Sequence, residues 1–449
     1  MLRRTPQKLS VLLVLLVLVF SAAAGTGAAA ETKLTLDQSY EIALEQSPTV
    51  QKARAQIRAA EGTEGRARSG FLPHLAVSGG FGKYYSHPST VQITSTGTSS
   101  VFSFGTNEQA DASSYGATFS QAVFTGGRLV NTLGAANKGL EITKEELRRT
   151  EQALKYNVAS AYYNVLKNIK LVELNRQSVE MAEHHLANNQ ALFKAGIATR
   201  AEVLRGEVLV AQNHISLIRS EQGLELTKNS FNNVLGNALD TPVELAEANF
   251  STGEVVIYNY RDLLPIAYES QPEWRQYLLG KKIRSDELGV AYSGLFPNIS
   301  LAGTYSGGLT RYSAYQSDQA TWSALVSGSW NIFDGTDTLY KIKEAGGRLD
   351  AEIASEENVR RNLALSVKDA NFIVKSAKED MVYTAKAVEL AEENYKIADL
   401  RYNSGAGNNL EVLDAQVSLT RARTDNVDAQ NILQLAKAKL NQVLGREIY

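Results

Sequence analysis

The sequence predicts a chain that combines membrane-type β-strands with very long α-helices, in two copies of one unit. A first observation is the motif LFKAGIATRAEVL at residues 192–204, which returns 209 residues later within LRYNSGAGNNLEVL. A second is a pair of long segments, Leu140–Ala195 and Arg348–Ser404, that contain neither glycine nor proline. A third is the alternation of apolar with small or polar residues in two segments, at 299–311 and 321–333.

The first 30 residues have the three parts of a secretory signal peptide. Arg3, Arg4 and Lys8 give a basic start, an apolar run follows at 11–20, and small residues lead to Ala30. The alternative is a membrane anchor, but so short an apolar run does not span a bilayer as a helix. We therefore expect export from the cytoplasm, with Glu31 as the first mature residue.

Composition argues against several functions. A formal net charge of −2 gives no electrostatic case for binding nucleic acid. The chain has no cysteine, and its five histidines include only one neighbouring pair, His184 and His185, whose side chains point to different sides of a helix. We expect solvated histidines, no bound metal and no cofactor. No nucleophile, base and orienting acid share a recognisable context, so the chain is not predicted to be an enzyme.

Further landmarks repeat at the same offset, such as the LG pairs at Leu235 and Leu444. Upstream the offset is 224, so the first copy carries about 15 extra residues, which we assign to a predicted polar loop at Ser89–Ser114. The expected organisation is a signal peptide at 1–30, a first repeat at 31–240, an equatorial connector at 241–260 and a second repeat at 261–449.

Each copy is predicted to begin with a helix of moderate length, at 36–68 and at 261–290. After two strands comes a helix of more than fifty residues, roughly 85 Å long at 1.5 Å per residue. A second long helix then returns, at 199–235 and at 408–444. Helices of this length pack side by side and do not fold around one compact core.

The strand segments ISLAGTYSGGLTR and TWSALVSGSWNIF are apolar on one face and small or polar on the other. Such segments, with aromatic residues near their ends, are typical of transmembrane β-strands, although a soluble sheet with one buried face gives the same pattern. Four strands cannot close a barrel, and open edges are not tolerated in hydrocarbon. The membrane interpretation therefore requires several chains to share one barrel.

This order of signal peptide, duplicated half, strand pair, long helix, glycine-broken turn and returning helix resembles the TolC family of outer-membrane efflux proteins, over residues 36–444. The resemblance implies a homotrimer with a shared twelve-stranded β-barrel in outer-membrane lipid and a long α-helical barrel in the periplasm. It also implies two partners, a periplasmic adaptor (membrane fusion) protein and an inner-membrane pump of the RND, ABC or MFS type.

The two glycine-broken motifs are then the helix-to-helix turns at the periplasmic tip. Gly196 and Gly405 suit the left-handed residue that ends a helix. Thr199 and Asn408 suit N-caps, and the glutamate three positions after each predicts a capping box in both copies. The resemblance assigns tip formation and adaptor docking to Gly196, Thr199, Val203, Leu204, Gly405, Asn408, Val412 and Leu413.

The resemblance also implies a pore constriction made by Glu411 and Asp414, with six carboxylates in a trimer. A latch that holds the tip closed would join Tyr402 to Glu202. The family also uses an arginine in this latch, but the matching position here is Gly407. The ion pair of the latch is therefore left without a candidate residue. The alternative is structural: both glutamates would only cap their helices, and Asp414 would be a solvated helix residue.

The predicted function is a trimeric outer-membrane channel-tunnel. It would export small molecules, or proteins by type I secretion, across the periplasm and outer membrane together with its pump and adaptor. The alternative is a periplasmic coiled-coil adaptor or a structural protein of an export complex. Such a protein would share the long helices but not four alternating strands. The transported substrate is not specified by the sequence.

Overall fold

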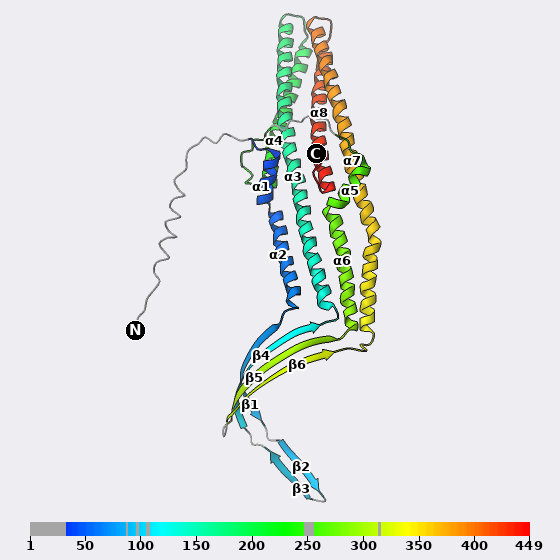
Figure 1. The fold of residues 1–449 in the computed structure, drawn as a ribbon. Helices are drawn as coiled ribbons and strands as arrows, with labels where there is room; N and C mark the ends of the chain where they lie inside the picture. The colour runs from blue at the N-terminus through cyan, green and yellow to red at the C-terminus, as the bar shows by residue number, and fades with distance from the viewer. Residues whose placement is uncertain (1–32, 87–88, 96–97, 105–107, 247–255, 313–315) are drawn as a thin grey trace, which may run out of the picture.

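The computed structural model describes residues 33–86, 89–95, 98–104, 108–246, 256–312 and 316–449. The predicted signal peptide and the middle of the connector lie outside these residues, so both remain predictions. Figure 1 shows an elongated molecule with long helices at one end and a curved sheet at the other.

Two helical hairpins of equal size form most of the chain. The first consists of α3 (Arg128–Lys194) and α4 (Arg200–Leu235), and the second of α7 (Asp337–Asn403) and α8 (Asn409–Leu444). Both α3 and α7 have 67 residues, which corresponds to about 100 Å. Both helices begin earlier than expected, α3 by 12 residues and α7 by 11, because glycine was wrongly taken to exclude a helix. A glycine inside a helix costs only about 1 kcal/mol, which packing can offset.

The short helices are α1 (Leu36–Gln46), α2 (Pro48–Ser69), α5 (Tyr260–Ser270) and α6 (Pro272–Tyr292). The prediction of one continuous helix in each copy is therefore wrong. Ser47 and Gln271 both precede a proline and have extended backbones, with ψ of 121° and 120°. The ring of a following proline disfavours the helical conformation of the preceding residue, so each helix stops there and a new one starts at the proline.

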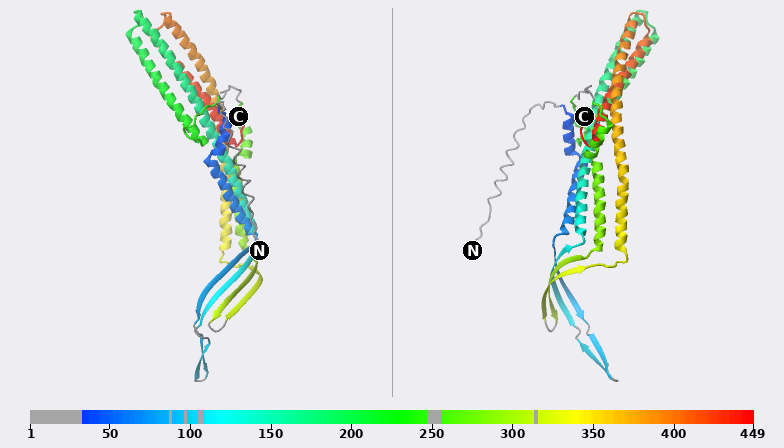
Figure 2. Two further views of the ribbon diagram at one scale, coloured as in Figure 1. Left: turned by 90° about the vertical axis from the view of Figure 1, so that its left-hand side faces the viewer. Right: turned by 45° about the vertical axis from the view of Figure 1, so that its right-hand side comes forward.

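Each long helix changes its partner along its length. Toward the turns α3 packs on α4 and α7 on α8, whereas toward the sheet α3 packs on α2 and α6, and α7 on α6 (Figure 1). The two hairpins are joined by contact between α3 and α8. Figure 2 shows the helices as a thin layer in which α3 and α8 are central and α4 and α7 form the two flanks.

Two equivalent core clusters lie where the partners change. In the first, Val158 of α3 and Phe231 of α4 are completely buried; in the second, Val367 of α7 and Leu440 of α8 take the same places 209 residues later. Tyr162 lies in the first cluster, and its hydroxyl is 2.8 Å from the carbonyl oxygen of Ala246. Both clusters therefore tie a short helix to a hairpin.

The sheet contains β1 (His74–Ser86), β4 (Glu108–Phe124), β5 (Asn298–Tyr312) and β6 (Gln316–Ser329) in the antiparallel order β1-β4-β5-β6. The register places Leu301 opposite Val326 and Tyr305 opposite Trp322, which confirms the predicted apolar face. On the other face the hydroxyls of Thr304 and Ser323 lie 2.6 Å apart. β6 ends four residues before the predicted end at Phe333.

The segment predicted as a loop contains a second sheet. Strands β2 (Ser89–Ser95) and β3 (Thr98–Phe104) pair in antiparallel order and extend beyond the far end of the main sheet, and β4 begins at Glu108 (Figure 1). The serine- and threonine-rich composition suggested a loop, but the threonine, valine, isoleucine and phenylalanine residues in these segments suit strands, so the prediction was wrong.

One residue at the sheet-to-helix junction carries backbone strain. Thr336 has a φ of 73°, a conformation that is unfavourable for a β-branched residue, while the first copy has Gly127 at this position with a φ of 89°. We expect Thr336→Gly to stabilise the protein by about 1 kcal/mol, since glycine adopts this conformation without steric cost. The check is the denaturant midpoint of the helical circular dichroism signal. Gly127→Thr is the reciprocal control and should lower that midpoint.

Candidate functional site: the helical tip

The two turns at the end of the hairpins have the same backbone geometry. Gly196 and Gly405 both have a φ of 75°, which ends α3 and α7 in the left-handed conformation. In the first turn the amide of Ile197 donates to the carbonyl of Leu192, at 2.9 Å between N and O, and in the second Ala406 donates to Arg401, at 2.8 Å. This is the Schellman arrangement, which uses the last free carbonyls of a helix. The predicted role of both glycines in the fold is confirmed.

The returning helices start at the predicted caps. The side chains of Thr199 and Asn408 accept from the amides of Glu202 and Glu411, at 3.4 Å and 3.0 Å. The capping box is complete only in the first copy, where a Glu202 oxygen lies 2.6 Å from the Thr199 nitrogen. In the second copy the Glu411 carboxylate accepts from the Asn408 side-chain amide and pairs with Arg401, at 3.4 Å between nitrogen and oxygen. The prediction of a capping box in both copies is therefore wrong for the second.

The residues expected to dock an adaptor fall into two groups. Val203 and Val412 are buried inside their own hairpins, with 1% and 0% exposure, so within the described chain they offer no surface to a partner. Leu204 is exposed and Leu413 partly so. Ile197, which was not singled out from the sequence, is 75% exposed at the turn itself. The assignment of the two valines to docking is therefore corrected.

Tyr402 is held by a residue that the sequence did not suggest. Its hydroxyl donates to Asn189 of α3, at 2.7 Å between oxygens, whereas Glu202 is engaged with Thr199. The structure thus replaces the predicted hydrogen bond between Tyr402 and Glu202 with one to Asn189. Burial, and secondarily the charge of Glu202, raise the pKa of Tyr402. The hydroxyl therefore remains protonated and can donate throughout the neutral range.

Asn189 belongs to a buried polar network that joins the two hairpins. Its amide donates to Asn409 Oδ1 at 3.2 Å, and His185 Nε2 lies 2.5 Å from the same oxygen. The rings of His185 and Tyr402 are 5.5 Å apart. His185 is 3% exposed, so the expectation of solvated histidines is wrong for it. A signal was present: position 185 follows Ser178 and Ala182 at the spacing that marks one helix face.

A candidate metal site is not found in the described part of the chain. Among these residues no group of three or more histidine, aspartate or glutamate side chains is arranged to hold a metal ion. In the same part of the chain, no helix combines the length and apolar character needed to cross a membrane.

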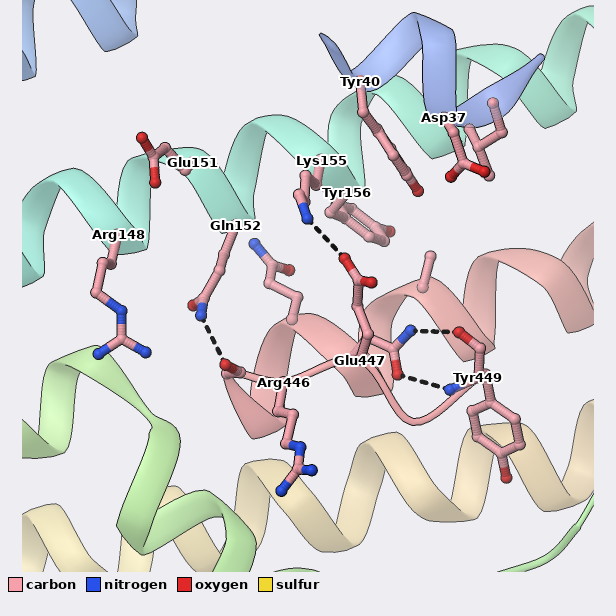
Figure 3. A pocket seen from close by; sticks show the side chains of 15 residues that line it. Asp37, Tyr40, Arg148, Glu151, Gln152, Lys155, Tyr156, Arg446, Glu447 and Tyr449 are labelled. Atoms are coloured by element: carbon pink, nitrogen blue, oxygen red, sulfur yellow. Dashed lines mark hydrogen bonds and ion pairs between the residues drawn. The ribbon is translucent and has the colours of Figure 1, made fainter. Parts of the chain in front are cut away.

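A pocket of about 490 Å³ lies at mid-height between α1, α3 and the end of α8 (Figure 3). Two bonds cross it: Lys155 pairs with Glu447 at 2.6 Å, and the Gln152 side chain donates to the Gly445 carbonyl at 2.9 Å. Asn441 holds the backbone of Tyr449 on the same side. Since these contacts join the two repeats, we interpret the pocket as a structural joint.

Duplicated helical hairpins, a sheet with one exposed apolar face and paired turns at the far end define a class of protein, the channel components of outer-membrane export systems. Residues 39–237 and 263–446 match the family model described as outer membrane efflux protein. The chain belongs to this family. Its members are channel proteins and not enzymes, and the protein lies in the outer membrane with its long helices in the periplasm.

Individual relatives agree with this assignment. Outer membrane protein OprJ of Pseudomonas aeruginosa is 25% identical over 325 residues, which cover 71% of this chain and 67% of that protein. Outer membrane protein TolC of Escherichia coli is 21% identical over 421 residues, covering 91% and 82%. The solved structure of VceC from Vibrio cholerae has a TM-score of 0.77 at 17% identity, covering 92% of this chain and 97% of that one. It shows that the fold is shared.

Proposed function

We propose that three copies of this chain close into one conduit, which exports small molecules or proteins across the periplasm and outer membrane. The observation that carries the proposal is the open sheet. β1 pairs only with β4 and β6 only with β5 among the described strands, so both edges are left without partners. Unpaired backbone groups are not tolerated in hydrocarbon, and pairing β6 of one copy with β1 of the next removes every edge. Three copies, the number that the family resemblance implies, give twelve strands.

The exposed apolar face of the sheet supports a lipid environment. Val77 of β1 is 80% exposed and Trp322 of β6 is 76% exposed in the single chain. The backbone register places Val77, Ala117, Tyr305 and Trp322 in one row across the four strands. A soluble sheet would cover such a row with a second layer, and the described helices leave it bare. This apolar face therefore fits the acyl chains of membrane lipid.

The flanks of the helical layer support closure of the periplasmic part. α4 carries exposed apolar residues at helical spacing, including Leu204, Val208 and Ile215. On the opposite flank α7 exposes Leu390 and Ile397. Since these two flanks end the row α4-α3-α8-α7, packing α4 of one copy against α7 of the next would bury both and close a ring of helices.

The tip is proposed as the entrance and as the docking end for a periplasmic adaptor, with an inner-membrane RND, ABC or MFS type pump supplying energy. A relative in Pseudomonas putida is described as a probable efflux pump outer membrane protein, TtgC. Ile197 and Leu204 of the first turn, with Leu413 of the second, supply the accessible apolar contacts. Gly196, Gly405, Thr199 and Asn408 would act by fixing the shape of the turns.

The narrowest point is proposed at Asp414, with Glu411 beside it and Tyr402 tying the hairpins together. Asp414 is exposed, and its backbone carbonyl accepts from the side-chain hydroxyl of Ser418. Carboxylates around a narrow entrance favour cations and bind multivalent ones. The test is planar-bilayer recording of the detergent-purified oligomer. We expect cation-selective steps that Mg²⁺ suppresses, and weaker suppression in Asp414→Asn; a folded oligomer that passes no current would contradict the proposal.

A further inference from the structure

A single arginine, Arg401 in the last turn of α7, crosses the open side of the second turn. Its Nη2 donates to the carbonyl oxygen of Ala406 at 3.3 Å, and its Nη1 lies 3.4 Å from Glu411 Oε2. The guanidinium thus connects the end of one helix, the turn and the first turn of the next helix. Asn408 binds the other oxygen of Glu411, at 3.1 Å. Both oxygens of this carboxylate are therefore engaged.

Gly407 packs closely against the end of α7 where Arg401 lies. A Cβ atom at position 407 would lie 3.1 Å from the Cβ of Arg401 and 3.1 Å from the backbone nitrogen of Tyr402. A Cβ at 407 would press on these atoms by a few tenths of an ångström. Gly407 leaves this side of the turn open, and the side chain of Arg401 lies across it.

The first turn shows that the arginine is not needed for folding of the turn. It has the same φ at its glycine and the same carbonyl contacts, although Leu192 stands at the position equivalent to Arg401. Arg205 stands at the position of Asp414. An exposed ion pair such as that of Arg401, whose side chain is 55% exposed, also adds little to folding stability. The main effect of Arg401 is therefore on the local charge at the turn.

We propose that Arg401 sets the ion preference of the entrance by neutralising Glu411, so that Asp414 alone supplies unpaired negative charge in each chain. The inference rests on the proposed conduit. The number of unpaired carboxylates expected at the entrance of a trimer then falls from six to three.

The test measures the cation-to-anion permeability ratio and the Mg²⁺ block of the purified oligomer in planar bilayers. Arg401→Gln frees Glu411, so we expect block about tenfold tighter and a higher cation preference. The double variant Arg401→Gln with Glu411→Gln removes a neutral pair and should return both values to those of the wild type. Arg401→Lys keeps the charge and should resemble the wild type.

Arg421→Gln is the matched control, because Arg421 is an exposed basic residue of α8 ten positions beyond Glu411. It should leave both values unchanged. Unchanged block in Arg401→Gln, or a double variant that fails to restore wild-type behaviour, would overturn the role of Arg401. A wild-type oligomer without current would instead overturn the conduit, so the two failures are distinguishable.

Discussion

Tyr162→Ala is expected to destabilise the protein by about 3–5 kcal/mol, the cost of removing a large buried aromatic side chain. The ring is 2% exposed and lies 6.1 Å from that of Phe231, centroid to centroid. Its hydroxyl also satisfies the carbonyl of Ala246, which anchors the connector after α4. Loss of the ring therefore loosens the joint between α1, α3 and the connector. The measurement is the denaturant midpoint of the purified protein.

Tyr162→Phe separates the two contributions of this residue. Phenylalanine keeps the ring and removes only the hydroxyl, so we expect a loss of about 1–2 kcal/mol. Burial raises the pKa of Tyr162 to about 12, which means that the hydroxyl is a protonated donor at working pH. If the phenylalanine variant were as unstable as the alanine variant, the hydrogen bond rather than ring packing would dominate.

Asn189→Leu is expected to loosen the tip. The substitution keeps a similar volume but leaves the hydroxyl of Tyr402 buried without its acceptor. An unpaired buried group costs about 1–3 kcal/mol, which corresponds to a change of about 5-fold to 150-fold in local opening. Limited trypsin digestion measures this opening, because Lys194, Arg200 and Arg401 lie at the turns. Cleavage there should accelerate while the rest of the chain is unaffected.

Asn188→Leu is the matched control for this prediction. The adjacent amide makes an exposed hydrogen bond to Asn403, at 2.8 Å, outside the buried network. Its replacement should leave the rate of tip cleavage close to that of the wild type. Equal acceleration in both variants would contradict the role of the buried network and indicate a general effect of leucine on α3.

The repeat, the long helices and the alternating faces of β5 and β6 could be predicted because each leaves a local periodic signal in the chain. Helix ends were less predictable. Gly134 and Gly139 lie inside α3, and packing of α3 on α6 offsets the low helix propensity of glycine; at Gly134 a carboxylate oxygen of Asp286 in α6 lies 2.9 Å from the place of a Cβ. The breaks at Pro48 and Pro272 were visible in the sequence but were not used.

At the tip, backbone roles were predictable and side-chain partners were not. Gly196, Thr199 and their counterparts act through conformations and caps that depend on neighbours in the sequence. The partners of Tyr402 and Glu411 depend on which helix faces meet in space. Asn189 is more than two hundred residues from Tyr402, and no local pattern indicates that the two side chains would be in contact.

Disulfide cross-linking between β1 and β6 shows whether copies of this chain close one barrel. The chain has no cysteine, so a cysteine at Val77 can be combined in turn with one at Ala320, Ala324 or Gly328 without background. A cysteine pair at Gly303 and Ala324, which are neighbours within one chain, is the control for oxidation. One of the β1–β6 combinations should give a ladder ending at three chains on a non-reducing gel. Formation of the control disulfide without any species larger than one chain would contradict this closure.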